Sequence, residues 1–274
     1  MPLPHKNWGF KKHLGQHFLQ DQNILWKIAN AANLQPTDTV VEIGPGKGSL
    51  TRLLLQKAGR VIAIEKDTTL REYWETEFQT AQNLELHFGD FLKFDLQSIA
   101  TTPNKLKVIG NIPYNISSPI LFQLLEHRKI ISVAVLTMQK EVAQRIAALP
   151  DNKNYGIITI LTQIYANASL LFDIQAGSFT PPPKVTSSTI RLSFPDVMPY
   201  PLEAHEELRQ LVKRAFGKRR KTFENTLKGF YPPELILNAL KWCHLDPKVR
   251  PENVTVAQYV ALANTIKSLY TEVS

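Results

Sequence analysis

The sequence predicts an α/β protein in two parts, a mostly parallel sheet covered by helices followed by a small all-helical domain. Apolar segments of strand length alternate with helix-like stretches from residue 39 onward. Pro195, Pro199 and Pro201 then mark a short linker, and only helical patterning follows it. The chain of 274 residues also exceeds the ~100–200 residues usual for one domain. We therefore expect domains at residues 1–195 and 196–274.

Strands are expected where short apolar runs are bounded by polar or turn-forming residues. Seven segments fit this description: residues 39–43, 60–64, 84–88, 106–109, 131–138, 169–174 and 185–194. The first five alternate with helix-like stretches, which is typical of parallel strands joined by crossover helices. The last two follow one another without a full helix between them, so we expect an antiparallel edge pair there.

Helices are expected from capping and periodic signals. Thr69-Leu70-Arg71-Glu72 has the spacing of a capping box, and Asp67 is expected to cap the same helix. In the second domain, residues 208, 211, 212 and 215 are apolar and form the stripe of an amphipathic helix. Similar stripes run through residues 235–242 and 256–269, so this domain is expected to be helical throughout.

Composition narrows the class of protein. Hydrophobic residues make up 43% of the chain and charged residues 20%, as in ordinary globular proteins. No apolar run approaches the ~20 residues of a membrane helix, and the N-terminus lacks a secretory signal, so we expect a cytoplasmic protein without membrane association. Cys243 is the single cysteine, which excludes an intramolecular disulfide and a cysteine-based zinc cluster. We expect it to be a small buried hydrophobe, and we expect a monomer without a metal.

A glycine-rich turn follows the first expected strand. Residues 44–48 have the spacing G-x-G-x-G, and glycine lets a backbone approach a ligand closely. Dinucleotide-binding folds use G-x-G-x-x-G, but Ser49 stands where the third glycine belongs. The loop thus favours S-adenosylmethionine, which carries no phosphate, with Gly44 and Gly46 beside it. The glycines alone are equally consistent with a structural turn.

Two carboxylates follow the next two strands. Glu65 ends the second strand, where an acid can accept hydrogen bonds from both ribose hydroxyls of a nucleoside. Asp90 follows the third strand and could accept from the adenine amino group. Either one alone is more simply a solvated carboxylate or a helix cap. At the carboxyl ends of successive strands, the pair favours a cofactor site.

The segment Asn111-Ile112-Pro113-Tyr114 follows the fourth strand and suits methyl transfer to an adenine amino group. The lone pair of that nitrogen is delocalised into the ring, so two acceptors on its N–H bonds would free it for in-line attack. The Asn111 amide oxygen and the Ile112 carbonyl are the expected acceptors. Pro113 would rigidify the turn, and Tyr114 would stack on a base extruded from its own stack. An ordinary Asn-x-Pro turn with a buried tyrosine remains the alternative.

These segments together resemble a known family. KKHLGQHFLQD, VVEIGPGKGSLT, AIEKD, FGD, GNIPYNISSPILFQLL, MQKEVAQRIAA, NYGIITILTQ, FTPPPKV and FGKRRKTFENTL occur in the order typical of ribosomal RNA adenine dimethyltransferases. The resemblance covers nearly the whole chain. It implies a Rossmann-like catalytic domain, S-adenosylmethionine as the cofactor, and dimethylation of N6 of two adjacent adenines in the 3′-terminal hairpin loop of 16S rRNA, within a precursor of the small ribosomal subunit.

Carried over residue by residue, the resemblance implies cofactor contacts at His17, Leu19, Gly44, Glu65, Asp90 and Asn111. It also implies that Phe179 stacks on the target adenine opposite Tyr114. His17 departs from the asparagine of many relatives, and a core histidine is an equally good interpretation of it. Ile112 replaces a leucine frequent in bacterial relatives, which leaves its carbonyl unchanged.

Positive charge points to RNA. The net charge is +8 and the isoelectric point is near 9.4, which favours polyanions. Six basic residues crowd into one segment of the helical domain: Lys213, Arg214, Lys218, Arg219, Arg220 and Lys221. We expect them to contact phosphates, although a solvated helix face is the simpler alternative. Lys6, Lys11, Lys12 and His13 in the basic N-terminal arm are a second candidate contact.

Three other functions remain open at this point. An enzyme of the same chemistry could act on 23S rRNA of the large subunit. An RNA-binding ribosome-assembly or transcription factor could keep the fold without catalysis, but the cofactor acids and Asn111 argue against it. A nicotinamide-dependent oxidoreductase is disfavoured by Ser49 and by the lack of a dehydrogenase acid–base constellation.

Overall fold

The computed structural model describes residues 17–100, 104–218 and 221–273, and the chain divides into two compact units. The sheet unit comprises Met1–Ala143 and Ser169–Phe194, and the helical unit comprises Gln144–Ala168 and Pro195–Ser274. The chain enters the helical unit for the second time at Pro195, one residue before the start of the expected second domain at residue 196. Residues 144–168, which we expected in the first domain, are instead part of the helical unit.

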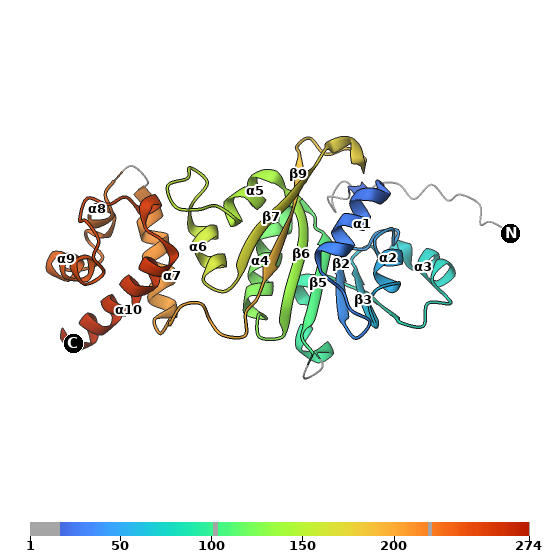
Figure 1. Cartoon of the computed structure of the whole chain (residues 1–274), viewed down its shortest axis with the longest axis horizontal. Coiled ribbons are helices and arrows are strands. Elements are labelled where there is room, and N and C mark those ends of the chain that lie inside the picture. Colours follow the sequence, from blue (N-terminus) through green and yellow to red (C-terminus); the bar gives the residue numbers. More distant parts are fainter. Residues whose placement is uncertain (1–16, 101–103, 219–220, 274) are drawn as a thin grey trace. The chain divides into compact units, whose positions relative to one another are not determined.

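Seven strands form the main sheet, in the order β4-β3-β2-β5-β6-β9-β7 (Figure 1). Their bounds are Thr39–Ile43 (β2), Arg60–Glu65 (β3), Leu84–Phe88 (β4), Leu106–Asn111 (β5), Ile131–Gln139 (β6), Asn167–Ile174 (β7) and Ser187–Ser193 (β9). Strands β2 to β6 run parallel to one another, and β9 pairs antiparallel with β6. The predicted α/β class is confirmed. Strand β9 lies between β6 and β7, so β7 is the edge.

Five α-helices occur in the described chain between residues 17 and 146, before, between and after strands β2 to β6. They are α1 (Gln22–Ala31), α2 (Thr51–Leu55), α3 (Arg71–Glu77), α4 (Ser117–Glu126) and α5 (Lys140–Ile146). Every residue of β2 is buried, because helices cover the sheet around it. Helix α1 is capped by Asp21, whose carboxylate accepts hydrogen bonds from the backbone N–H groups of Asn23 and Ile24. It buries Leu25 and Ile28 in a core shared with β2, β5 and β6.

The start of α3 differs from expectation. Asp67 does cap this segment, with Oδ1 accepting from the Thr69 backbone, as predicted. The capping box at residues 69–72 is wrong, because residues 68–70 form a 3₁₀ turn and the Thr69 hydroxyl donates to Asp67 instead. The residue before α3, Leu70, makes no side-chain cap. Asp67 therefore satisfies the Thr69 N–H, one of the two backbone groups that the box was expected to satisfy.

A second, two-stranded sheet was not predicted. Strand β1 (Phe18–Leu19) pairs antiparallel with β8 (Phe179–Thr180), so that Leu19 lies opposite Phe179. Strands of two residues have no detectable period, and this pairing joins segments that are far apart in the sequence. It brings the start of the described chain to the edge of the site discussed below.

The helical unit contains α6 (Ile157–Gln163), α7 (His205–Ala215), α8 (Phe223–Leu227), α9 (Pro233–Trp242) and α10 (Val256–Val273). Its core explains the placement of residues 144–168. Tyr155, Ile160 and Ile164 are fully buried in one cluster with the apolar stripe of α7, including Leu208 and Leu211. The Tyr155 hydroxyl also donates to the Val254 carbonyl at 2.9 Å. Burial of these apolar side chains stabilises the packing of residues 144–168 in the helical unit, because the same side chains would be exposed to water in a solvated loop.

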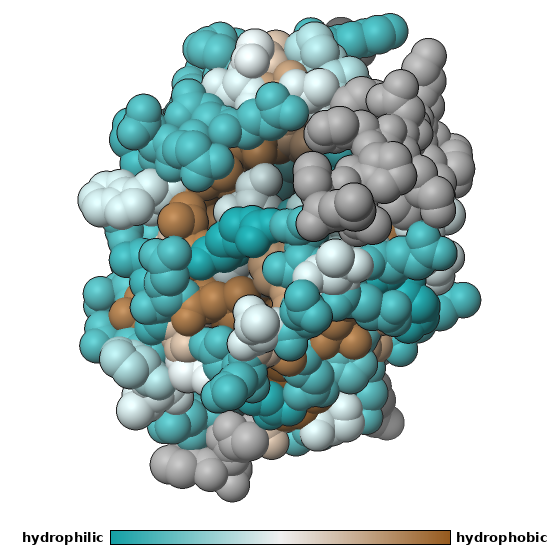
Figure 2. Space-filling model, turned by 90° about the vertical axis from the view of Figure 1, so that its right-hand side faces the viewer, coloured by the Kyte–Doolittle hydropathy of each residue, from teal (hydrophilic) through white to brown (hydrophobic). Residues whose placement is uncertain are grey.

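Seven short 3₁₀ helices complete the described elements: η2 (Thr68–Leu70), η3 (Phe91–Lys93), η4 (Leu96–Ile99), η5 (Tyr114–Ile116), η6 (Ala176–Ser178), η7 (Phe216–Lys218) and η8 (Pro251–Asn253). In the described ranges, no helix has both the length and the apolar character required to span a bilayer. Figure 2 shows one side of the surface, where hydrophilic residues prevail and hydrophobic ones are seen mostly in recesses between them.

Candidate active site

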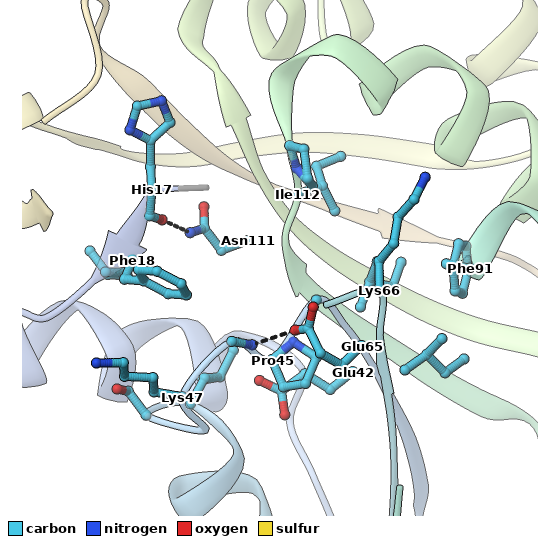
Figure 3. A pocket seen from close by; sticks show the side chains of 18 of the residues that line it. His17, Phe18, Glu42, Pro45, Lys47, Glu65, Lys66, Phe91, Asn111 and Ile112 are labelled. Atoms are coloured by element: carbon cyan, nitrogen blue, oxygen red, sulfur yellow. Dashed lines mark hydrogen bonds between the residues drawn. The ribbon is translucent and has the colours of Figure 1, made fainter. Parts of the chain in front are cut away.

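A cavity of about 220 Å³ opens in the sheet unit at the carboxyl ends of β2, β3, β4 and β5. The strand order reverses between β2 and β5, and ligands of such sheets bind at this switch point. Figure 3 shows Asn111 between His17 and Ile112, Glu42 and Glu65 near the glycine loop, and Lys66 and Phe91 on the far side. All the cofactor residues expected from the sequence line this cavity: His17, Leu19, Gly44, Gly46, Glu65, Asp90 and Asn111.

The glycine loop forms one wall of the cavity. Gly44 and Gly46 have φ angles of +61° and +59°, a region that side chains disfavour. A Cβ at Gly44 would meet no heavy atom within 4 Å, so this position opens on the cavity. A Cβ at Gly46 would lie 2.4 Å from the Phe18 ring. The second glycine is therefore required by the close approach of β1, a contact that the sequence pattern could not show.

Glu65, the last residue of β3, is buried and held by two backbone N–H groups. Gly46 donates to Oε2 at 2.9 Å and Asp67 donates to Oε1 at 2.7 Å. Burial raises the pKa of this carboxyl, and the two backbone hydrogen bonds oppose the rise. The side chain is thereby fixed in place, and each oxygen keeps further lone pairs for a ligand.

Asp90 lies just after β4 and is paired with Lys66. The Lys66 ammonium donates to Oδ2 at 2.7 Å, and the Leu92 backbone donates to Oδ1 at 3.1 Å. The hydrogen bond from Lys66 is the main cause that lowers the Asp90 pKa. The acid is thus ionised at neutral pH. Lys66 itself was not singled out from the sequence, because a lysine after a strand is usually solvated.

Glu42 is a further carboxyl of the cavity that sequence reasoning missed. It is the fourth residue of β2 and only 2% exposed. The Thr51 hydroxyl donates to its Oε2 at 2.6 Å. Burial raises the pKa of Glu42 to about 8, and the charge of Glu65 adds to the rise. The available signal was one acid in the otherwise apolar strand that leads into the glycine loop.

The predicted catalytic loop begins at the last residue of β5. The Asn111 side-chain nitrogen donates to the His17 carbonyl at 2.8 Å (Figure 3). This bond fixes the amide orientation and leaves the Asn111 oxygen able to accept. The Ile112 N–H donates to the Thr137 carbonyl, whereas no described residue donates to the Ile112 carbonyl. The two oxygens that we expected to accept hydrogen bonds from the adenine amine therefore belong to consecutive residues, Asn111 and Ile112.

Tyr114 follows Pro113 in the cavity wall and is half-buried. Its hydroxyl hydrogen-bonds the Ser187 hydroxyl at 2.6 Å, and its ring stacks on His17 with centroids 5.6 Å apart. The His17 Nδ1 atom is 2.7 Å from the Pro181 carbonyl oxygen. His17 is thus a wall residue of the cavity and not a core histidine.

Phe179 is placed differently from the expected catalytic residues. It does not line the cavity, is 2% exposed, and packs in the core cluster that contains Leu19 and Leu25. In this conformation its ring cannot stack on a base in the cavity. Stacking of Phe179 on the target adenine stays a prediction that would require the ring to move.

The expected RNA-binding residues lie in the helical unit around the end of α7. Lys213, Lys218 and Lys221 are exposed. Arg214 is engaged within the chain, because it donates to Gln210 at 2.7 Å and lies over the rings of Phe230 and Tyr231. Arg219 and Arg220 lie outside the described residues, as do Lys6, Lys11, Lys12 and His13 of the N-terminal arm.

Comparison with protein families gives a match over most of the chain. The family described as ribosomal RNA adenine dimethylase matches residues 7–268. Relatives named ribosomal RNA small subunit methyltransferase A are similar over nearly their full length. The protein of Pseudomonas aeruginosa is 39% identical over 94% of this chain and 95% of its own. The protein of Vibrio cholerae is 38% identical over 95% and 94%.

Solved structures show the same fold. A dimethyladenosine transferase from Plasmodium falciparum superimposes with a TM-score of 0.77 at 28% identity, over 90% of this chain and 96% of that one. The 23S rRNA methyltransferase ErmE superimposes with a TM-score of 0.74 at 26% identity, over 91% and 99%.

Proposed function

Because this chain belongs to the ribosomal RNA adenine dimethylase family, we propose that it dimethylates N6 of two adjacent adenines in the 3′-terminal hairpin loop of 16S rRNA, during assembly of the small ribosomal subunit. It is an rRNA adenine dimethyltransferase. The single observation that best supports the chemistry is the hydrogen bond from the Asn111 side-chain nitrogen to the His17 carbonyl, which leaves the Asn111 amide oxygen able to accept.

The cavity fits S-adenosylmethionine, the cofactor that the family implies. Glu65 offers a fixed carboxylate for ribose hydroxyls, and ionised Asp90 suits the adenine amino group. Gly44 leaves open space beside them. When bound, the cofactor supplies an electrophilic methyl group on a sulfonium.

The residues of this chain prepare the amine for that methyl group. The Asn111 amide oxygen and the Ile112 carbonyl oxygen accept hydrogen bonds from the two N–H groups of the adenine amine. These two hydrogen bonds draw the amine nitrogen toward a tetrahedral geometry. Tyr114 stacks on the extruded base, and its hydrogen bond to Ser187 holds the ring in place. The methylated amine is acidic enough to lose its proton to solvent, so no strong base is required.

The substrate is proposed to be small-subunit RNA, bound partly through the exposed lysines of the helical unit. Such contacts position RNA without reading its sequence, and recognition then depends on RNA shape and on the extruded base. The likeness to a 23S rRNA methyltransferase keeps large-subunit RNA as the second candidate. The names of the sequence relatives favour the small subunit.

The test is methyl transfer to separated ribosomal subunits. Small- and large-subunit particles from a strain lacking the modification would be incubated with the enzyme and radiolabelled S-adenosylmethionine. We expect label in small-subunit RNA, mapping by mass spectrometry to two adjacent dimethylated adenines. Label only in large-subunit RNA would overturn the substrate, and no label in either with wild-type protein but normal cofactor binding would overturn the activity.

A further inference from the structure

The Glu42 carboxyl is the group of the cavity that the proposed reaction leaves without a role. Its Oε2 accepts from Thr51 at 2.6 Å, whereas its Oε1 accepts from no described residue. The residue is 2% exposed and still lines the cavity. Figure 3 shows Glu42 beside Glu65 in the cavity wall.

The surroundings of Glu42 contain no compensating positive charge. Helix α2 presents the neutral Thr51, β5 pairs its apolar Ile109 with Glu42, and β3 adds the acid Glu65. Of the two cavity lysines, Lys66 is paired with Asp90, and Lys47 points away from Glu42 in Figure 3. Within the described residues no cation forms an ion pair with Glu42.

A second carboxylate beside Glu65 is costly in such a place. Two carboxyls that share a buried site cannot readily both ionise, and burial by itself already favours the neutral acid. Glu65 is the better candidate for the charge, since two backbone N–H groups donate to it. Glu42 receives one hydroxyl hydrogen bond only. Its pKa of about 8 agrees with this ranking.

We propose that Glu42 carries a proton in the cofactor-free protein and gives it up to solvent when the positively charged cofactor binds. This inference rests on the proposed cofactor. S-adenosylmethionine carries a sulfonium, an ammonium and a carboxylate, so its net charge is +1, and it brings into the cavity a positive charge of the kind that the surroundings of Glu42 lack. An opposite charge within ~4–6 Å favours the ionised form of a carboxyl. The proton moves from the Glu42 carboxyl to the buffer, and no bond to the cofactor is formed.

Proton release sets the pH dependence of cofactor affinity. Below the pKa of the free protein, binding must remove a proton, so affinity rises with pH, by up to tenfold for each pH unit. Above about pH 8 Glu42 is already ionised, and this contribution levels off. The affinity for the cationic cofactor therefore depends on the ionisation of the buried Glu42 carboxyl, which binding itself favours.

Calorimetry tests the proposal directly. Binding of S-adenosylmethionine would be measured at pH 7 in two buffers with different ionisation enthalpies, and the difference in heat gives the number of protons released. The cofactor's own amino group titrates at about 7.7–8.0 and contributes equally to every variant, so the measure is wild type minus Glu42→Gln. Because the pKa of about 8 lies above pH 7, we expect the wild type to release most of one proton more than Glu42→Gln at pH 7, and this difference should fall toward zero near pH 10.

Two further variants sharpen the test. Thr51→Val removes the hydrogen bond that favours the ionised acid, so the midpoint of the pH dependence should move upward. This variant keeps the proposal testable if Glu42→Gln fails to bind. Glu85→Gln is the matched control, because Glu85 is paired with Arg60 outside the cavity and should leave proton release unchanged.

Equal proton release by the wild type and Glu42→Gln, with both binding cofactor, would overturn the role of Glu42. An unmoved midpoint in Thr51→Val would overturn it as well. Failure of the wild-type protein to bind S-adenosylmethionine at any pH is a separate result, because it overturns the proposed cofactor and this inference with it.

Discussion

At the scale of single residues, the site depends on side chains whose position is fixed by backbone groups. Asn111 is oriented by the His17 carbonyl, and Glu65 by the N–H groups of Gly46 and Asp67. Tyr114 is held by another side chain, the Ser187 hydroxyl. Such side chains are preorganised, so for Asn111, which is proposed to contact the reacting amine, the contribution is expected mainly in the rate of the chemical step.

Asn111→Ala should lower the methyl-transfer rate by about 100- to 1,000-fold, because the lost acceptor acts mainly in the transition state. Affinities for RNA and cofactor should change only a few-fold. Single-turnover kinetics at saturating cofactor and RNA would measure the methyl-transfer rate. Calorimetric titration with the cofactor would show that the variant is folded, because only the folded protein has the cofactor cavity. A near-normal rate would contradict the proposed role of Asn111.

Tyr114 can be tested together with its partner. Tyr114→Ala should weaken capture of the extruded base, since base–aromatic stacking contributes ~1–3 kcal/mol. Tyr114→Phe and Ser187→Ala remove the same hydrogen bond from its two ends, which is worth about 0.5–1.5 kcal/mol. Both should therefore lose less than about tenfold in rate, and the double variant should be no worse than either single one. Additive losses would show that the bond does not position the ring.

At the scale of elements, strand ends and one small sheet assemble the cavity. Strands β3 and β5 extend to Glu65 and Asn111, so the functional residues are the last ones of their strands. Strand β1 supplies Phe18 and Leu19 from the opposite side, held by its pairing with β8. The glycine loop after β2 lies between these parts.

Gly46→Ala should disrupt this junction. The added Cβ would lie 2.4 Å from the Phe18 ring, and the φ of +59° costs a non-glycine residue ~1–2 kcal/mol. We expect about 2–4 kcal/mol lower stability once the displacement of Phe18 is included, and weaker cofactor binding. Denaturant unfolding would measure the first and calorimetry the second.

Gly177→Ala is the matched control for that loss. A Cβ at Gly177 would meet no heavy atom within 4 Å, and its φ lies outside the left-handed region. Its stability should stay within about 0.5 kcal/mol of the wild type. If both glycine variants lost equal stability, the contact of Gly46 with Phe18 would not be the cause.

At the scale of the whole molecule, the excess of 32 lysines and arginines over 24 acids favours binding to RNA. Part of this charge is used internally, as the stacking of Arg214 on Phe230 and its bond to Gln210 show. The exposed lysines 213, 218 and 221 are free of such contacts in the described part of the chain, so they are the candidates for phosphate binding.

Changing Lys213, Lys218 and Lys221 together to glutamine should weaken RNA binding and flatten its salt dependence. Each lost phosphate contact lowers the log–log salt slope by about 0.7–0.9. Cofactor affinity should not change. Lys228→Gln is the control, because Lys228 is already paired with Glu224 at 3.2 Å and should alter the slope less than one of the three. An unchanged salt slope in the triple variant would show that these lysines do not contact phosphates and are ordinary solvated surface residues.

The sequence by itself determined the main sheet, the glycine loop and the order of the functional motifs. A parallel strand that is buried on both faces appears as a nearly continuous apolar run, and β2 matches its predicted bounds. The edge strand β4 also matches its predicted bounds, although it is only partly buried and its sequence LELHF alternates apolar and polar residues. Strands β3 and β5 end one and two residues later than predicted, at Glu65 and Asn111, because polar residues interrupt the apolar signal there.

Only the tertiary structure decided which residues meet in the cavity. The pairing of β1 with β8, the clamp of Asn111 on His17 and the burial of Phe179 depend on contacts between segments that are far apart in the chain. Glu42 could not be assigned from its strand, because its raised pKa arises from burial and from Glu65. Local patterns determine elements, whereas the charge state of an acid depends on what the folded chain places around it.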